Sequence, residues 1–136
     1  EGASANCGSP VLVQTGTMAF TNTTAKNLFI LPAGSQVIGV NIDVITAFND
    51  SGTDVIDIGS TADPDLFVAA ASVVSAGRIV GTLVAANLAT ITNIGTSDLQ
   101  VTATYTGENA DSSTGSALIS VLYVMRNPDG SITQAP

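Results

Sequence analysis

The sequence predicts an all-β fold, and more specifically a jelly-roll-like antiparallel β-sandwich of about eight strands. Along most of the chain apolar residues alternate with polar ones, which places every second side chain on the same face of a strand. The alternating runs are rich in Val, Ile and Thr, which favour strands. Clusters of Gly, Pro, Asn and Asp separate the runs and are typical of turns. Strands at this spacing favour a sandwich or barrel, and a jelly roll arranges eight of them in two packed sheets.

The composition is compatible with one folded domain that has a single hydrophobic core. The chain has 136 residues, of which 45% are hydrophobic and only 10% are charged, whereas soluble domains usually contain about 25% charged residues. Disordered chains have the opposite composition, with low hydrophobicity and high charge. We expect an N-terminal arm at residues 1–10, a sandwich domain at residues 11–126 and a C-terminal tail at residues 127–136, because the two ends lack strong alternation.

The two clearest strands are Val37–Phe48 and Leu99–Thr106. In each of them the apolar side chains share one face and smaller or polar side chains share the other, as in a sheet with one face on the core and one in water. The core residues predicted for these strands are Ile38, Val40, Ile42, Val44, Leu99, Val101 and Tyr105. A third strand, Ala117–Met125, is apolar on both faces, which predicts a central strand or one covered by a neighbouring subunit.

Weaker alternation predicts the remaining strands, and one segment favours a helical turn instead. The weaker strands are Val11–Phe20, Lys26–Leu31, Val55–Ile58, Asp65–Ala70, Arg78–Val84 and Leu88–Ile94. The helical turn is expected in Ala69–Gly77, where alanine and serine dominate. Turn residues gather at Pro32–Gly34, Asn49–Gly52, Gly107–Gly115 and Asn127–Gly130.

The charge balance argues against nucleic acid and membrane partners. Eleven acidic residues and three basic residues give a net charge of −8. Nucleic-acid affinity depends on phosphate contacts from Lys and Arg, and an anionic membrane repels an acidic protein for the same reason. The apolar runs are far shorter than the ~20 residues that a membrane helix needs. We therefore expect no direct binding to nucleic acid and no membrane partner.

Residues that could support catalysis are scarce. The chain has no His, so a nucleophile cannot be paired with an imidazole base. Lys26 lies among small polar residues without a flanking motif, and Cys7, the single cysteine, has no cationic neighbour that would lower its pKa. Acidic pairs of the kind that hydrolyse glycosides usually accompany aromatic platforms, which are few here, and no glycine-rich phosphate loop precedes a helix. We expect that the chain is not an enzyme and has no cofactor.

The acidic loops offer one possible exception, a calcium site. Calcium prefers several carboxylate and carbonyl oxygens, and loops supply these well. Asp54, Asp63 and Asp65 flank one short predicted strand, and Glu108–Asp111 forms a second acidic loop. The spacing does not match an EF-hand. The three aspartates are thus candidate Ca²⁺ ligands, with solvated acidic loops as the alternative.

The middle of the chain resembles small structural proteins of tailed bacteriophages. The resemblance lies in LPAGSQVIGVNIDVITAFNDSGTDVIDIGSTADPDLF at residues 31–67, and it continues in SAGR at 75–78, VTATYTG at 101–107 and GSALISVLYV at 115–124. Some proteins of this type are jelly-roll cement or decoration proteins on the outside of a capsid. The resemblance carries no catalytic residues, and it covers most of the chain.

The resemblance implies a structural virion protein that binds the outside of a phage head and stabilises it through contacts between subunits. Its partners would be the major capsid protein and neighbouring copies of itself, and its location the capsid surface. The low charge and the positive mean hydropathy of +0.42 agree with extensive contacts, because a small free domain usually has a more charged exterior. Two alternatives stay open: a secreted Ca²⁺- or carbohydrate-binding sandwich module, and a subunit of an extracellular filament.

Overall fold

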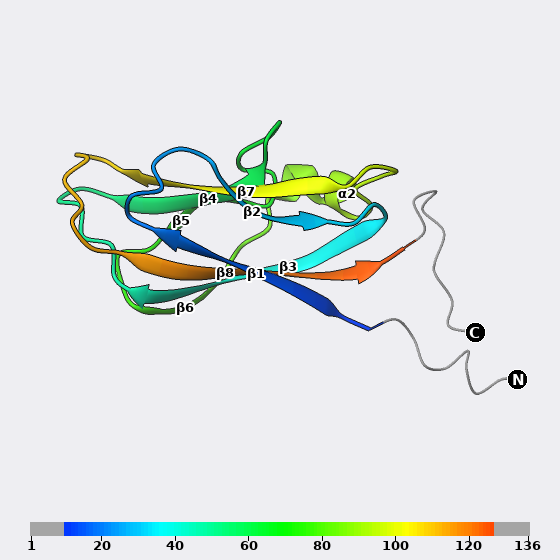
Figure 1. Ribbon diagram of the computed structural model, residues 1–136, viewed down its shortest axis with the longest axis horizontal. Helices are drawn as coiled ribbons and strands as arrows, with labels where there is room; N and C mark the ends of the chain where they lie inside the picture. The colour runs from blue at the N-terminus through cyan, green and yellow to red at the C-terminus, as the bar shows by residue number, and fades with distance from the viewer. Residues whose placement is uncertain (1–9, 127–136) are drawn as a thin grey trace, which may run out of the picture.

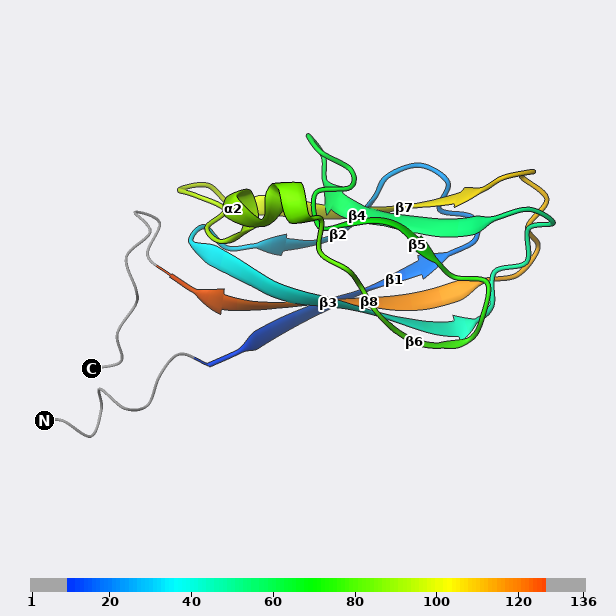
Figure 2. The same ribbon diagram turned by 180° about the vertical axis from the view of Figure 1, so that it is seen from behind.

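Two four-stranded antiparallel sheets pack face to face in the computed structural model, which describes residues 10–126 (Figures 1 and 2). The strands are β1 (Leu12–Ala19), β2 (Lys26–Leu31), β3 (Ser35–Thr46), β4 (Asp54–Ser60), β5 (Val68–Ser72), β6 (Gly77–Val80), β7 (Leu99–Gly107) and β8 (Ser116–Met125). Sheet A has the order β1-β8-β3-β6 and sheet B has the order β2-β7-β4-β5. Every connection except the one from β4 to β5 crosses between the sheets, which is the jelly-roll arrangement. The predicted fold class is confirmed.

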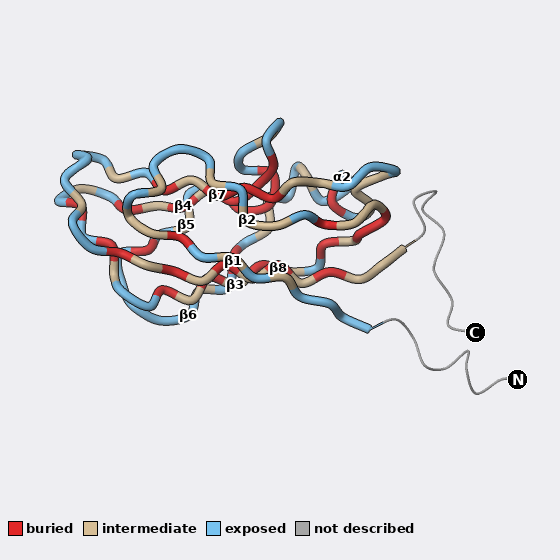
Figure 3. The backbone as a smooth tube through the Cα atoms, in the orientation of Figure 1, coloured by how far each residue is buried: buried red, intermediate tan, exposed pale blue. Residues whose placement is uncertain are grey.

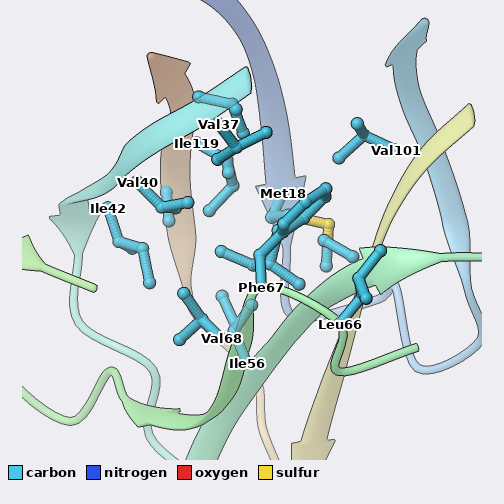
Figure 4. Close-up of a cluster of buried hydrophobic side chains, with 14 of the residues drawn as sticks. Met18, Val37, Val40, Ile42, Ile56, Leu66, Phe67, Val68, Val101 and Ile119 are labelled. Carbon is cyan, nitrogen blue, oxygen red and sulfur yellow. The ribbon is translucent and has the colours of Figure 1, made fainter. Parts of the chain in front are cut away.

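The core fills the space between the two sheets, and along the long strands buried residues alternate with half-buried or exposed ones (Figure 3). In β8 the buried residues are Ala117, Ile119, Val121 and Tyr123, and the residues between them are half-buried on the outer side. This strand pairs with β1 on one side and β3 on the other, so the predicted central position is confirmed. Met18, Ile56, Phe67 and Val101 belong to the cluster of buried side chains between the sheets (Figure 4).

One residue of the predicted core, Ile38, is exposed. Val40, Ile42, Val44, Val101 and Tyr105 are buried as predicted, and Leu99 is half-buried against the core. Ile38 is 43% exposed because β3 contains a β-bulge at this point. Val37 pairs with Tyr123 and Gly39 pairs with Leu122, so one extra residue enters β3 and the alternation shifts by one. Val37 therefore takes the buried position that the simple alternation assigned to its neighbour.

The predicted strand Leu88–Ile94 is wrong, and so is the predicted helical turn in Ala69–Gly77. The first segment begins with a short helix, α2 (Leu88–Ile91), which follows directly on a 3₁₀ turn, η1 (Ala85–Asn87), and places Ile91 in the core. In the second segment, β5 pairs with β4 through Ser72 and Ala71. Short apolar runs do not distinguish strand from helix, and here pairing along a sheet edge overrides the local preference of the alanines.

Candidate interaction surface

The three candidate calcium ligands lie at opposite ends of one strand. Asp54 is the first residue of β4, whereas Asp63 and Asp65 lie in the loop beyond its last residue. Seven residues of strand separate the two ends by roughly 20 Å, so the structure does not bring the three carboxylates together. Among residues 10–126 no group of three or more acidic, His or Cys side chains is arranged to hold a metal ion. A hydrogen bond and charge repulsion between the Asp63 and Asp65 side chains raise the pKa of Asp63.

Two other acidic loops do meet, and their carboxylates bind backbone amides. The Asp50 carboxylate accepts hydrogen bonds from the backbone N–H groups of Gly52 at 2.8 Å, Asn109 at 3.0 Å and Asp111 at 3.1 Å. Burial acts to raise the pKa of Asp50, but these amides outweigh it and hold the pKa below its usual value. Asp111 in turn accepts from the backbone and hydroxyl of Ser51. Sequence analysis assigned the loops to a turn and an acidic segment but did not identify Asp50 as the residue that joins them.

Asp54, which lies inside the sandwich, also uses its carboxylate to hold neighbouring groups by hydrogen bonds. Its carboxylate is 2% exposed and accepts hydrogen bonds from the Asp50 backbone N–H, at 3.2 Å, and from the Tyr105 hydroxyl. Burial, together with the bond to Asp54, raises the pKa of Tyr105 to about 12. The Tyr105 ring packs against Phe48 with ring centroids 4.8 Å apart. These carboxylates are therefore engaged within the fold, since each already accepts bonds from neighbouring donors.

An open pocket of about 460 Å³ lies at the same end of the sandwich. Its wall consists of hydroxyls, backbone and two aromatic rings, and it includes no charged side chain. The lining residues are Phe20, Thr21, Thr23, Tyr105, Thr106, Gly107, Ala110 and Ser112. Because Tyr105 is held in its neutral form at ordinary pH, the lining offers hydrogen bonding but no strong base.

Lys26 has a structural contact that explains its place in the sequence. Its Nζ donates to the Thr17 carbonyl oxygen at 2.6 Å, joining the edge strands β1 and β2. Gln14 makes a second link, since its Nε2 donates to the Ile30 carbonyl oxygen at 2.8 Å. These bonds occupy backbone oxygens that an edge strand would otherwise leave free. Cys7 and both predicted terminal segments apart from Pro10 lie outside the described residues.

The outer faces of the two sheets differ in how they are covered. On sheet B, the loop after β4 folds over Gly59 and Thr102: Thr102 is 1% exposed, and a Cβ on Gly59 would lie 2.2 Å from the Asp63 carbonyl oxygen. Sheet A is the lower layer in Figure 1, and no element of residues 10–126 lies over its outer side. Sheet A therefore presents its outer side chains directly to the surroundings.

The uncovered face of sheet A combines apolar and hydroxyl side chains. The strand register places the following residues on it: Val13, Thr15, Thr17, Ile38, Gly39, Asn41, Asp43, Arg78, Val80, Leu118, Ser120, Leu122 and Val124. Val80 is 74% exposed and Val13 is 58% exposed, which is unusual for large apolar residues on a sheet. We call this set of residues the open face.

The open face is electrically neutral although the protein is strongly acidic. The four strands of sheet A contain two charged residues, Asp43 and Arg78, and these form an ion pair at 2.8 Å. The other acidic residues of the described chain lie in the loops and on sheet B. Core regions of protein interfaces are depleted of charge in the same way. The open face is thus the best candidate interaction surface on the described chain.

Comparison with known proteins shows a likeness in fold but no match to a known sequence family. No family model and no curated protein matches the chain. A chain of the capsid asymmetric unit of cyanophage Pam1 superimposes with a TM-score of 0.69 at 22% identity, over 88% of each chain. The acid-stable capsid of Helicobacter pylori bacteriophage KHP30 contains a chain with a TM-score of 0.62 at 19% identity, over 95% of each chain. The capsid of Ralstonia phage GP4 contains one with a TM-score of 0.64 at 17% identity, over 88% of this chain and 87% of the other.

The likeness to structural proteins of phages, first seen in the sequence, is confirmed at the level of the fold. In each case nearly all of one chain matches nearly all of the other, so the matched chains are about as long as this one. The structure also contains no helix within residues 10–126 that is long and apolar enough to span a membrane. The chain has the jelly-roll fold of small chains in phage capsids.

Proposed function

We propose that this chain is a structural protein of a phage virion, and that it acts as a cement or decoration protein on the outside of the head. The observation that supports this most directly is the full-length likeness in fold to chains of three phage capsids. Each match spans nearly all of both chains, so the likeness includes the whole sandwich. Its partners would be the major capsid protein and neighbouring copies of itself.

The surface supports a role that depends on contacts and not on chemistry. Nine large hydrophobic residues of the described chain are exposed, and Val13, Ile38 and Val80 lie on the open face. A specific protein interface usually buries about 1,200–2,000 Å² in total. A small subunit bound at several boundaries of a shell would hold neighbouring shell proteins together through many modest contacts, since each further contact is made at high effective concentration.

The test is a comparison of phage particles with and without this protein. We expect particles that lack it to release their DNA at a lower temperature, and we expect added purified protein to bind them and restore the release temperature. Binding would be measured by sedimentation of the particles and DNA release by a fluorescent dye. Protein that fails to bind, or that cosediments only with isolated tails, would contradict a role on the head.

The pocket of about 460 Å³ favours a second candidate, a carbohydrate-binding module. Its hydroxyls and the exposed part of the Phe20 ring are groups that recognise sugars, because sugars combine hydroxyls with apolar ring faces. Calorimetry of the purified protein against simple glycans, with and without Ca²⁺, tests this alternative. Measurable heat that Thr23→Val reduces would favour the module, whereas no heat with any glycan would exclude it for the sugars used.

A further inference from the structure

Within residues 10–126, neither a positive φ nor a close contact requires glycine at position 39. Of the ten described glycines, nine either have a positive φ or have an atom within 4 Å of the position that a Cβ would take; Gly39 has neither. It lies in the interior of the longest strand, where glycine weakens a sheet because it adds flexibility and packs nothing. A glycine in such a place often marks a point where another backbone or side chain approaches closely. The bulge at this point does not itself require glycine, since Gly39 has no positive φ, and the described chain leaves the space beside Gly39 open to a partner.

The neighbouring bulge provides a projecting side chain next to this flat position. Val37 and Val40 point into the core, and the two residues between them both lie opposite Leu122 on the outer side. Ile38 projects from the surface with 43% of its area exposed, whereas Gly39 leaves a depression beside it. The bulge therefore sets an apolar projection and a depression side by side on the open face.

We propose that the open face is an interface between two copies of this chain, related by a two-fold axis, in which Ile38 of each copy lies over Gly39 of the other. A two-fold contact requires a self-complementary surface, in which residue i meets residue j and residue j meets residue i. An adjacent projection and depression meet this requirement. Leu122, opposite both residues on β8, and Val13, which pairs with Leu122 from β1, extend the apolar contact on each side.

Charge selects a second copy over a charged partner. Two copies that each carry a net charge of −8 repel one another through their acidic loops and through sheet B. The open face avoids this repulsion, since its two charges, Asp43 and Arg78, already neutralise each other. A strongly basic partner would find no unpaired acidic side chain on this face.

The open face is small for a protein interface. Four strands about 4.8 Å apart, with about eight residues at ~3.3 Å each, give a face of roughly 500 Å². Two such faces would bury roughly 1,000 Å², near the lower limit for a specific interface. An interface of this size belongs with weak, transient contacts, so the dimer should form only at high protein concentration.

Analytical ultracentrifugation of the full-length protein tests the proposal over about 1 μM to 1 mM, the range in which weak complexes form. We expect the weight-average mass to rise from 13.6 kDa toward twice that value. Gly39→Val should remain monomeric throughout and should melt no lower than the wild type, because nothing occupies the Cβ position and valine favours strands. Ile38→Ser should weaken association at least tenfold, since it removes the projection.

Thr104→Val is the control outside the open face, since it replaces a hydroxyl by a methyl group on the outer face of sheet B, opposite Asp57, and leaves sheet A unchanged. This variant should dimerise as the wild type does. A wild type that stays monomeric at every concentration, an assembly larger than a dimer, or a dimer that survives Gly39→Val would overturn the proposal. If the wild type is monomeric but Gly39→Val reduces binding to phage particles, the open face contacts the shell instead, and the proposed function stands without this dimer.

Discussion

Replacing Ile42 by alanine tests the packing of the sandwich, with Ile38→Ala as a control in the same strand. Ile42 is fully buried, on the inner side of β3 between Ile119 of β8 and Ile79 of β6. The substitution removes three carbon atoms at about 0.8 kcal/mol each, or about 2.4 kcal/mol in total. The cavity left behind raises the loss toward the upper part of the range of about 2–5 kcal/mol. Ile38 is 43% exposed, so the same change there should cost less than about 1 kcal/mol.

Urea denaturation followed by circular dichroism, at low protein concentration so that association contributes little, measures both losses. A chain of this length is stabilised by roughly 7–20 kcal/mol, so the Ile42 variant still folds and its melting temperature falls by roughly 10 °C. Equal losses for the two variants, or a loss below about 1 kcal/mol for Ile42→Ala, would refute the assignment of the inner and outer sides of β3.

Three further predictions concern the loops and the ends of the chain. Asp50→Asn should lower the melting temperature at pH 7 and should make the melting temperature fall less steeply on acidification. The pKa of Asp50 is lowered in the folded state, so the ionised carboxylate stabilises the fold at any pH above its unfolded pKa near 3.8. This stabilisation disappears as the pH falls from 3.8 through the lower pKa of the folded state. Millimolar Ca²⁺ should leave the melting temperature at its value in EDTA, because Asp54 lies at the opposite end of β4 from Asp63 and Asp65; a clear rise in Ca²⁺ would contradict the solvated-loop interpretation. Deleting residues 1–9 and 131–136 should leave the melting temperature of the domain nearly unchanged while weakening attachment to particles; full attachment of the truncated chain would place the contact on the sandwich itself.

The alternation of apolar residues was sufficient to predict the sheets because burial on one face of a strand imposes a period of two. Leu99–Thr106 lies in β7 with the predicted face inward, and Ala117–Met125 lies in β8 at the predicted central position. A bulge breaks this rule, so the alternation alone assigns Ile38 to the wrong face. Gly39 was the available signal, since a glycine inside a strand often marks a bulge or a close approach.

The candidate site was harder to predict because it depends on which loops meet in space. Asp54, Asp63 and Asp65 are close in sequence, yet an extended strand of seven residues separates Asp54 from the other two. Asp50 and Asp111 are 61 residues apart and come together because β4 pairs with β7, which aligns the loop before one strand with the loop after the other. The open face likewise follows from strand order, since the sequence does not state which outer face another segment covers.

Cryo-electron microscopy of intact virions tests the central claim most directly. We expect density for this jelly roll on the outer surface of the head, in contact with shell subunits, at a size that accommodates residues 10–126. Virions in which this protein is absent from the head, or lies only on the tail or inside the shell, would contradict its role as a cement protein.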